Sequence, residues 1–389
     1  MEINGAKMFV KALQEEGVDT LFAYPGGTAI DLFDALYDAE GIDMILPRHE
    51  QALVHAADGY ARSTGRVGVC LVTSGPGATN LVTGIATANY DSVPLVCFTG
   101  QVPMNLIGND AFQEVDIVGI TRSICKYAVT VRKREDLARI IKNAFYIART
   151  GKPGPVVVDI PKDIQLAMGS DEYPTEVNIR GYKPSEGVHV GQIKRALAEL
   201  KNAKKPVFLC GGGVNIAHAR KEMQELAEKT GIPVVTTIMG KGAIPTDHPL
   251  YVGNIGMHGN MASNKAIMES DVLFSIGCRF NDRITGTIDT FAKNAKIIHV
   301  DIDAASISRN IKVDIPIVAD AKVAISKMLE YAEPLDIKGW VDDIMNVKAE
   351  YPINMNRYDG VTPEAIIRTI NDMYSNLIVT TDVGQNQLW

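Results

Sequence analysis

Short apolar runs alternate with amphipathic helical patterns along two stretches of this chain, and this alternation restricts its fold more than any other feature. Parallel strands need a crossover connection long enough for a helix, so the alternation predicts parallel sheets covered by helices on both faces. The sequence therefore predicts the α/β class, with two Rossmann-like, doubly wound parallel-sheet domains in tandem. The predicted strands lie near 20–24, 42–46, 67–73, 93–99, 125–131 and 155–160, and near 206–210, 232–238, 271–276, 296–301 and 315–318.

The alternation also places the domain boundaries. The first domain is expected to cover residues 1–165 and the second residues 191–335. Residues 166–190 and 336–360 lack a sustained period or are rich in turn-forming residues, as linkers are. The chain is therefore expected to hold two complete domains joined by a linker.

A third unit is expected to cover residues 361–389. A helical pattern there includes Ile366 to Ile370, and an apolar run predicts one strand over Leu377 to Thr381. One helix and one strand cannot enclose a hydrophobic core. The third domain is therefore expected to be incomplete, and the chain truncated.

Charge and composition restrict the classes of partner. The chain has 39 basic and 46 acidic residues, a formal net charge of −7 and no basic stripe, which argues against nucleic-acid binding. No apolar run approaches the roughly 20 residues of a membrane span, and residues 1–7 lack the features of a signal peptide. We therefore expect a soluble, cytoplasmic protein with no membrane partner. The five cysteines are widely spaced and mostly in apolar strands, which predicts reduced core thiols.

Glu50 lies where a predicted strand ends and a predicted helix begins. In an open parallel sheet this junction lies at the carboxyl edge, where such folds bind ligands. The alternative role is structural, because a carboxylate in the first turn of a helix interacts favourably with the helix dipole. His49 and His55 are six positions apart, which favours ordinary polar packing over a metal site.

Glycine-rich turns follow two other predicted strands, at Pro25-Gly-Gly27 and at Ser74-Gly-Pro-Gly77. The second turn lacks the Lys-Ser/Thr pair of a P-loop, so it does not predict a phosphate cradle. Its structural alternative is a tight turn that lets a helix pack closely on its strand. Three predicted strand ends thus carry glycine or proline residues, at 25–27, 47 and 75–77, and one of them also carries the carboxylate of Glu50.

These motifs occur in combination with others. Pro25-Gly-Gly27, the stretch from Pro47 to Arg62, and Thr73 to Asn80 together resemble the pyrimidine-binding domain of thiamine-diphosphate enzymes. Gly100-Gln-Val-Pro103 and the stretch from Ala111 to Thr121 narrow this resemblance to the acetohydroxyacid (acetolactate) synthase catalytic subunits. The resemblance extends over essentially the whole chain, and it implies the thiamine-diphosphate-enzyme fold.

The resemblance implies an active site at the carboxyl edge of the first sheet. Glu50 matches the glutamate that protonates the remote pyrimidine nitrogen of thiamine diphosphate. Phe112 matches an aromatic wall of the substrate pocket, Gln113 an amide that binds the 2-oxo acid, and Lys162 a lysine near the substrate entrance. Without the resemblance, Gln113 would be an ordinary loop residue and Lys162 a solvated surface lysine. The implied catalytic residues are Gly27, Glu50, Phe112, Gln113 and Lys162, and the implied thiamine-diphosphate contacts are Gly26, Glu50, Pro76, Gly77, Val383, Gly384, Gln385 and Asn386.

A second cofactor is implied for the second domain. The stretch Arg279-Phe-Asn-Asp-Arg283 resembles the arginine motif in the FAD segment of anabolic members of the family. Two arginines four apart can bind a pyrophosphate, and Asp301 ends a strand where it could accept a hydrogen bond from a ribose. The alternative is a structural ion pair between Arg279 and Asp282. The implied FAD contacts are Lys152, Gly211, Gly212, Gly213, Met257, His258, Gly277, Arg279, Arg283, Asp301, Ile302, Asp320 and Ala321.

Three positions depart from the family pattern. Asn281 replaces an aspartate of the arginine motif, Lys152 replaces an arginine, and Asn386 replaces a histidine beside the cofactor diphosphate. Lysine keeps the positive charge but loses the two-pronged contact of arginine. These departures bear on the affinity for FAD and on the diphosphate contact, and they leave the carboxylate of Glu50 in place.

The activity implied is that of an acetolactate synthase. Pyruvate is decarboxylated on thiamine diphosphate, and the two-carbon unit joins a second 2-oxo acid, either pyruvate or 2-oxobutyrate, in branched-chain amino acid biosynthesis. FAD is expected to be structural, since this carboligation transfers no net electrons to a flavin. The family implies a homodimer or homotetramer with active sites at the subunit interface, and a regulatory small subunit. The Mg²⁺ ligands are expected beyond residue 389, so the 389-residue chain is expected to be inactive.

Two classes of alternative stay open. Among related enzymes, glyoxylate carboligase dispenses with the glutamate and the catabolic acetolactate synthase lacks the arginine motif, so Glu50 and Arg279 count against them. A pyruvate oxidase is a further alternative of this class. A non-catalytic nucleotide-binding scaffold of two Rossmann-like domains belongs to a different class, and it predicts no cofactor-dependent chemistry.

Overall fold

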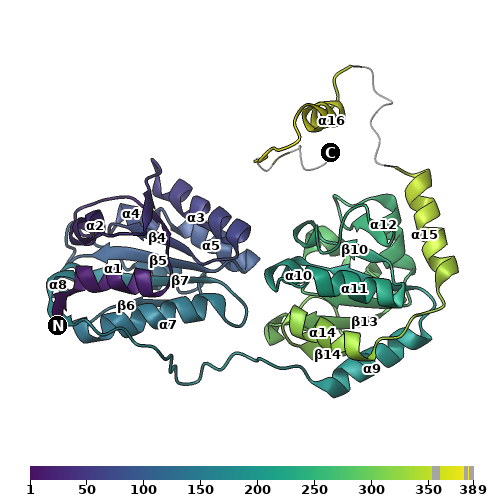
Figure 1. The fold of residues 1–389 in the computed structure, drawn as a ribbon, viewed down its shortest axis with the longest axis horizontal. Coiled ribbons are helices and arrows are strands. Elements are labelled where there is room, and N and C mark those ends of the chain that lie inside the picture. Colours follow the sequence, from purple (N-terminus) through teal and green to yellow (C-terminus); the bar gives the residue numbers. More distant parts are fainter. Residues whose placement is uncertain (353–359, 381–383, 385–389) are drawn as a thin grey trace. The chain divides into compact units, whose positions relative to one another are not determined.

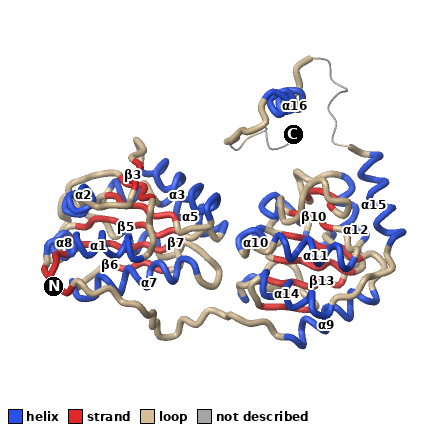
Figure 2. Tube along the Cα trace, viewed as in Figure 1, coloured by secondary structure: helices blue, strands red, loops and turns tan. Residues whose placement is uncertain are grey.

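The computed structural model of the chain describes residues 1–352, 360–380 and 384. Two compact units divide between Pro184 and Ser185, and we call them unit 1 and unit 2. Figure 1 shows a sheet with helices packed around it in each unit, and Figure 2 shows the same arrangement coloured by secondary structure. The predicted α/β class with two parallel sheets is confirmed.

The unit 1 sheet has six parallel strands in the order β3-β2-β4-β5-β7-β6. The chain runs outward from β2 to β3, returns to the other side of β2 to form β4, and continues away from it. The direction of winding therefore reverses between β2 and β4, where doubly wound sheets open a crevice. The strands are β2 (Thr20–Ala23), β3 (Asp43–Ile45), β4 (Gly68–Val72), β5 (Leu95–Gln101), β6 (Tyr127–Thr130) and β7 (Pro155–Pro161).

Two apolar layers cover the two faces of this sheet, because successive side chains of a strand point to opposite faces. In β4, Val69 and Leu71 pack in one layer, whereas Cys70 and Val72 pack in the other. Helices α1, α2 and α7 contribute to the first layer, and α3 and α5 to the second. The helices are α1 (Gly5–Glu15), α2 (Ile30–Tyr37), α3 (Glu50–Thr64), α4 (Pro76–Thr79), α5 (Val82–Asp91), α6 (Ile117–Thr121), α7 (Leu137–Arg149) and α8 (Lys162–Leu166).

A small antiparallel ribbon, absent from the predicted strands, joins the two ends of unit 1. It pairs β1 (Glu2–Asn4) with β8 (Met168–Ser170). The chain beyond β8 also packs on unit 1, since the Tyr173 hydroxyl donates to Glu16 at 3.0 Å. Glu16 pairs in addition with Lys142 at 2.8 Å. Residues soon after β8 are therefore anchored to α1 and α7.

The unit 2 sheet is also fully parallel, in the order β11-β10-β9-β12-β13-β14. Numbered from the first strand of the unit, this is the order 3-2-1-4-5-6 of a dinucleotide-binding Rossmann sheet, whose crevice lies between its first and fourth strands. That crevice falls between β9 and β12 here. The strands are β9 (Pro206–Cys210), β10 (Val234–Thr236), β11 (Tyr251–Asn254), β12 (Val272–Ile276), β13 (Lys296–Asp301) and β14 (Ile315–Val318).

One continuous apolar core fills unit 2. Helix α15 belongs to it, because Trp340 is buried and its indole N–H donates to the carbonyl of Pro206 at 3.1 Å. Much of the segment after residue 335 thus packs on unit 2. The helices are α9 (Val190–Asn202), α10 (Gly212–Ile216), α11 (Arg220–Thr230), α12 (Met261–Glu269), α13 (Asp282–Thr285), α14 (Ala321–Tyr331) and α15 (Lys338–Glu350).

The C-terminal stretch follows its predicted pattern only in part. Helix α16 (Pro363–Met373) forms where the apolar periodicity indicated, but residues 377–380 do not form a strand. A strand without a neighbour to pair with leaves its backbone groups unsatisfied by the chain, so the prediction from the apolar run was wrong. Across the described residues, none of the helices combines the length and hydrophobicity needed to cross a bilayer.

Candidate active site

Five loops of unit 1 leave the carboxyl ends of its strands at one edge of the sheet. They follow β2, β3, β4, β5 and β7, and they carry the residues predicted for catalysis. Parallel strands place such loops together at the sheet edge. The predicted residues 26–27, 50, 76–77, 112–113 and 162 therefore share this edge.

Glu50 is the first residue of α3 and is half-buried. Its Oε2 accepts a hydrogen bond from Nδ2 of Asn80 at 2.9 Å. The imidazole of His49 caps the helix by accepting from the N–H of Gln51 at 3.0 Å, and His55 is exposed. No cluster of three or more metal-binding side chains occurs among the described residues.

The loops after β2 and β4 are tied together by two threonines. The hydroxyls of Thr28 and Thr73 lie 2.9 Å apart, and the N–H of Ser74 donates to Oγ1 of Thr28 at 3.0 Å. Gly26 packs so closely on this pair that a Cβ there would lie 2.5 Å from the Cβ of Thr73. Glycine is therefore needed at residue 26 for the two loops to meet.

Gly77 lies beside Glu50 and packs closely on Thr73. A Cβ at Gly77 would lie 3.5 Å from Oε1 of Glu50 and 2.8 Å from Cγ2 of Thr73. Gly27 is open, since a Cβ there would meet nothing within 4 Å. Pro76, the first residue of α4, is exposed. The surroundings of the carboxylate thus leave room for a group of another molecule.

The segment 103–115 carries Phe112 and Gln113 to the same edge. Gln113 has a positive φ of 57°, and its backbone packs against Gly75, where a Cβ would lie 2.5 Å from the carbonyl oxygen of Gln113. Phe112 projects outward with 86% of its surface exposed. The two residues therefore lie beside the turn at 74–77, with the aromatic ring free of the rest of unit 1.

Lys162 begins α8, directly after β7. Its ammonium lies 3.4 Å from the carbonyl oxygen of Gly27 and 3.8 Å from Oδ2 of Asp31. The side chain therefore turns toward the loop after β2. This contact favours the predicted place of Lys162 at the site over that of an unattached surface lysine.

A buried carboxylate lies beneath these loops. Asp159, near the end of β7, is 2% exposed and accepts hydrogen bonds from Thr99 Oγ1 at 2.7 Å, Gln101 Nε2 at 3.2 Å and Thr130 Oγ1 at 3.1 Å. Burial raises the pKa of this carboxyl to about 6, although the three hydrogen bonds lower it. The neighbouring carboxylate of Asp116 also raises it.

The raised pKa of Asp159 predicts a pH-dependent stability. Between the unfolded value of 3.8 and about 6, the folded chain holds more protons at this residue than the unfolded chain does. The free energy of unfolding should therefore fall as pH rises through this window, by up to about 3 kcal/mol from this group. Chemical denaturation followed by circular dichroism checks this against Asp159→Asn, which should lack this part of the slope. Parallel profiles for the two proteins would contradict it.

In unit 2, the crevice between β9 and β12 is closed at its base by glycines. Gly211 donates its N–H to the carbonyl of Ile276 at 2.9 Å, and Gly213 donates to Gly277 at 3.1 Å. A Cβ at Gly211 would lie 2.1 Å from the carbonyl oxygen of Gly277. The N–H groups of Gly211 and Gly213 are therefore used in hydrogen bonds to the segment after β12. Among the described residues, the N–H of Gly212 makes no such bond.

The arginine motif follows β12 and is anchored by Phe280. The ring of Phe280 is buried and stacks edge-on against His299 at a centroid distance of 5.0 Å. Asn310 donates to the carbonyl oxygens of Arg279 and Phe280 at 3.2 and 3.0 Å. Arg283 is exposed and lies 3.9 Å from Asp282, so Asp282 has an ionic contact with Arg283 within this motif.

Asp301 ends β13 beside this motif. One of its oxygens accepts from the N–H of Asp303 at 2.9 Å, and the other lies 3.6 Å from Nε2 of His299. Both ring nitrogens of His299 and Nδ1 of His258 are buried without a hydrogen-bond partner among the described residues. The edge therefore holds polar atoms that the described part of the chain leaves unsatisfied.

Other residues predicted for FAD binding have structural contacts. Asp320 caps α14 by accepting from the N–H groups of Lys322 and Val323 at 2.8 and 3.2 Å. Ala321 is buried, Ile302 is half-buried, and Met257 is exposed.

Lys152 belongs to unit 1, where it neighbours Lys126. Burial and the charge of Lys152 together lower the pKa of Lys126 to about 8.

Gly384 is exposed, whereas the predicted diphosphate contacts Val383, Gln385 and Asn386 lie outside the described residues. No contact of these three residues is therefore assigned.

The comparisons with known proteins follow the same division of the chain. Residues 3–120 match the thiamine pyrophosphate enzyme N-terminal TPP binding domain, and residues 193–328 match the central domain of these enzymes. A protein of Methanococcus aeolicus named "Probable acetolactate synthase large subunit" is 48% identical over 410 residues, which cover 100% of this chain and 68% of that protein. The chain belongs to the acetolactate synthase large-subunit family.

Two bacterial relatives agree with this family membership. The acetolactate synthase large subunit of Haemophilus influenzae is 46% identical over 398 residues, covering 100% of this chain and 70% of the relative. The acetolactate synthase isozyme 3 large subunit of Escherichia coli K12 is 46% identical over 402 residues, covering 100% of this chain and 69% of the relative. The predicted resemblance is confirmed.

No role was assigned from the sequence to three residues that the structure places at or beneath the site, namely Asn80, Gln101 and Asp159. Asn80 lies inside the motif 73–80, and Gln101 lies inside the motif 100–103, but a spacing pattern does not show which distant side chain each will contact. Asp159 had a signal of its own, because it is the charged residue within the apolar run 155–160. A carboxylate in such a run is buried and needs partners.

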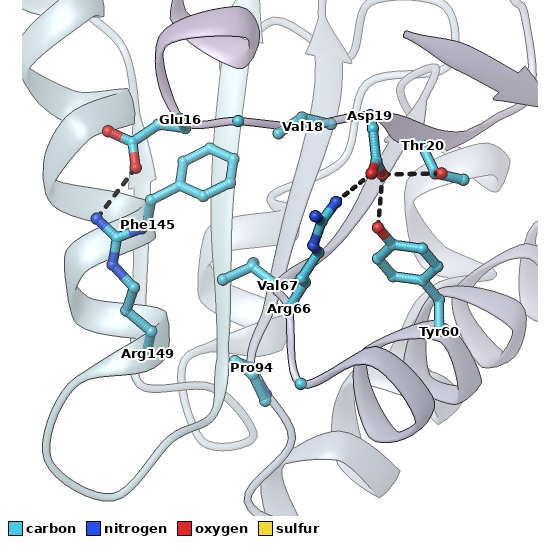
Figure 3. A pocket seen from close by; sticks show the side chains of 12 residues that line it. Glu16, Val18, Asp19, Thr20, Tyr60, Arg66, Val67, Pro94, Phe145 and Arg149 are labelled. Carbon is cyan, nitrogen blue, oxygen red and sulfur yellow. Dashed lines mark hydrogen bonds and ion pairs between the residues drawn. The ribbon is translucent and has the colours of Figure 1, made fainter.

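A cavity of about 320 Å³ in unit 1 lies away from these residues. Figure 3 shows side chains that line it. The lining includes residues 65–67 and 94, which directly precede β4 and β5, so the cavity lies at the amino ends of the strands, whereas Glu50 follows the carboxyl end of β3. Asp19 accepts from the Tyr60 hydroxyl at 2.6 Å and pairs with Arg66, and Glu16 pairs with Arg149 at 3.2 Å. Because these charged groups satisfy one another, the cavity is not the candidate active site of this family member.

Proposed function

We propose that the complete protein is an acetolactate synthase, which decarboxylates pyruvate and joins the two-carbon unit to pyruvate or 2-oxobutyrate. The observation that carries this proposal is the half-buried carboxylate of Glu50, held by Asn80 at 2.9 Å beside Gly77. Membership of the acetolactate synthase large-subunit family supports it. When bound, thiamine diphosphate supplies the carbanion chemistry that removes carbon dioxide and forms the new carbon–carbon bond.

Glu50 is assigned the proton-transfer role toward the remote pyrimidine nitrogen. Its Oε2 is engaged by Asn80, so Oε1, the oxygen on the side of Gly77, is the atom that would hold the proton. The open space at Gly27, where a Cβ would meet nothing within 4 Å, and the exposed Pro76 support a fit for a flat heterocycle beside this carboxylate.

The substrate residues are assigned from the neighbouring loops. Phe112 would exclude water from the pocket with its exposed ring, and Gln113 would donate to the bound 2-oxo acid. Lys162 adds a positive charge beside the loop of Gly27, which favours the approach of an anionic substrate.

The test of this function uses the complete gene product. Supplied with thiamine diphosphate, Mg²⁺, FAD and pyruvate, it is expected to form acetolactate, and with added 2-oxobutyrate also 2-aceto-2-hydroxybutyrate. A protein that binds thiamine diphosphate but forms neither product would rule the proposal out. Acetyl phosphate formed from pyruvate, phosphate and oxygen would favour the pyruvate oxidase alternative. Mg²⁺ is expected with the diphosphate, and no ligand for it is assigned in this chain.

FAD is proposed for the carboxyl edge of unit 2. The Rossmann strand order and the position of the arginine motif at the end of β12 support it. The unsatisfied nitrogens of His258 and His299 suit a polar ligand. Arg279 and Arg283 would contact the pyrophosphate, Asp301 the ribose, and Gly212 could offer its N–H to a phosphate oxygen.

The arginine motif predicts a measurable loss of flavin binding. Arg279→Ala is expected to weaken FAD binding by about tenfold or more, because a charge-assisted contact to a pyrophosphate is worth roughly 1.5–3 kcal/mol. Quenching of flavin fluorescence on titration measures the affinity directly. Lys293→Ala, at an exposed residue of the same unit, is the control and should bind FAD as the wild type does. Equal affinity of both variants would contradict the assignment.

The assembly proposed is a homodimer or homotetramer with a regulatory small subunit. The support is that the relatives are named large subunits. Light scattering of the complete gene product, alone and with a co-expressed small subunit, would measure both associations. A protein that stays monomeric under both conditions would rule this assembly out.

A further inference from the structure

The side chain of Gln101, the last residue of β5, contacts Val102, which precedes the segment 103–115, and Val115, which closes it. We propose that Gln101 is a positioning residue, held by Asp159, which fixes this segment and thereby the places of Phe112 and Gln113 at the active site. The inference rests on the proposed function only where it treats those two residues as substrate contacts.

Both N–H donors and the carbonyl oxygen of the Gln101 amide form hydrogen bonds at this junction. Its Oε1 accepts from the N–H of Val102 at 2.9 Å. Its Nε2 donates to the carbonyl oxygen of Val115 at 3.0 Å and to Oδ2 of Asp159 at 3.2 Å. A primary amide has two N–H donors and one carbonyl oxygen. One buried side chain therefore joins the residue before the segment to the residue that closes it.

Asp159 determines which way the amide faces. A carboxylate accepts hydrogen bonds and donates none, so only the NH₂ group of Gln101 can face it. A reversed amide would place its oxygen against the carboxylate and its NH₂ against the N–H of Val102. Thr99 and Thr130 hold the carboxylate from β5 and β6. The sheet thus fixes Asp159, and Asp159 fixes Gln101.

A second contact ties the start of the segment to the next loop. The N–H of Met104 donates to Oδ1 of Asp163 at 3.1 Å, and Asp163 directly follows Lys162 in α8. From the same helix, Gln165 donates to the carbonyl of Thr28 at 2.8 Å. Helix α8 therefore connects the 103–115 segment to the loop after β2.

The segment is braced internally as well. Glu114 accepts hydrogen bonds from the N–H groups of Gly108 and Ala111, the latter at 3.1 Å. Because the segment is closed on itself in this way, losing its attachment at Gln101 should shift Phe112 and Gln113 together rather than one of them alone.

The test compares Gln101→Leu with the wild type in the complete gene product. Leucine has a similar size but no amide. Amide hydrogen exchange across residues 104–114 is expected to rise about tenfold, and the KM for pyruvate about tenfold. We expect kcat to stay within about threefold, because the variant loosens substrate binding rather than the proton transfer. Unchanged exchange in Gln101→Leu would overturn the proposal.

Variants of the same network separate positioning from general destabilisation. Thr130→Val removes a hydrogen bond to the same carboxylate without touching the segment, so exchange and KM should stay within about twofold of the wild type. Asp159→Asn keeps an acceptor oxygen and should preserve KM, whereas Asp159→Leu should behave like Gln101→Leu. If amide exchange across residues 104–114 rose as much in Thr130→Val as in Gln101→Leu, the proposal would be overturned. So would raised exchange with an unchanged KM. A wild-type protein that forms no acetolactate would overturn the proposed function instead, and the exchange comparison would still test Gln101.

Discussion

Replacing Glu50 with glutamine is expected to lower the rate of acetolactate formation at least about a hundredfold, since positioned proton transfer contributes roughly 10²–10⁴ to a rate. Glutamine has nearly the same size as glutamate, and its carbonyl oxygen can still accept from Asn80, which donates to Oε2 at 2.9 Å in the wild type. The fold should therefore survive. What is lost is a group that can hold and release a proton beside Gly77.

The measurement is acetolactate formation from pyruvate by the complete gene product, with thiamine diphosphate at saturation. Glu40→Gln is the matched control, because it makes the same change at an exposed residue of unit 1 and should leave the rate unaltered. The affinity for thiamine diphosphate should be recorded as well. A Glu50→Gln enzyme that binds the cofactor and retains the wild-type rate would show that another group transfers the proton.

Gly211→Ala is expected to destabilise unit 2 by about 4 kcal/mol or more. Overpacking a core usually costs about 1–3 kcal/mol and occasionally more. Here the new methyl would lie 2.1 Å from the carbonyl oxygen of Gly277 and 2.7 Å from Cα of Cys278. Both are backbone atoms of the crevice between β9 and β12, so neither can rotate away.

Denaturation followed by the fluorescence of Trp340 reports on this unit directly, because that indole is buried in its core; Trp389→Phe would remove the other tryptophan. Gly339→Ala is the control. Gly339 lies in α15 with nothing within 4 Å of a Cβ, so alanine there should stabilise by about 0.5 kcal/mol, as it does inside helices. Equal stabilities for the two variants would contradict the close packing described at Gly211.

The central strands of both sheets could be predicted because they are buried on two faces and are therefore mostly apolar. β9, β13 and β14 have the predicted bounds, and β5 and β7 differ by one or two residues at their ends. The place of Glu50 at the start of α3 also followed from the sequence, since Pro47 stops the apolar run and the helical spacing begins at Gln51. The five cysteines are free and four of them are buried, as their positions in apolar runs indicated.

The features that were not predicted depend on contacts between distant residues. β11 is a short edge strand interrupted by Gly253, whose φ is 143°, and β1 and β8 have three residues each. Such short strands form because a partner lies alongside, not because of their own pattern. The contacts of Asn80 with Glu50 and of Gln101 with Asp159 span 30 and 58 residues. No local period encodes them.

The anchoring of the chain beyond β8 decides where unit 1 could be cut out for separate expression. A gene fragment ending at residue 165 would remove β8, the antiparallel partner of β1, and would leave Glu16 without the hydroxyl of Tyr173. A fragment ending at Pro184 keeps both, and it coincides with the division between the two compact units. Limited proteolysis of the intact chain should likewise spare the peptide bonds from 168 to 173 and cleave only further along.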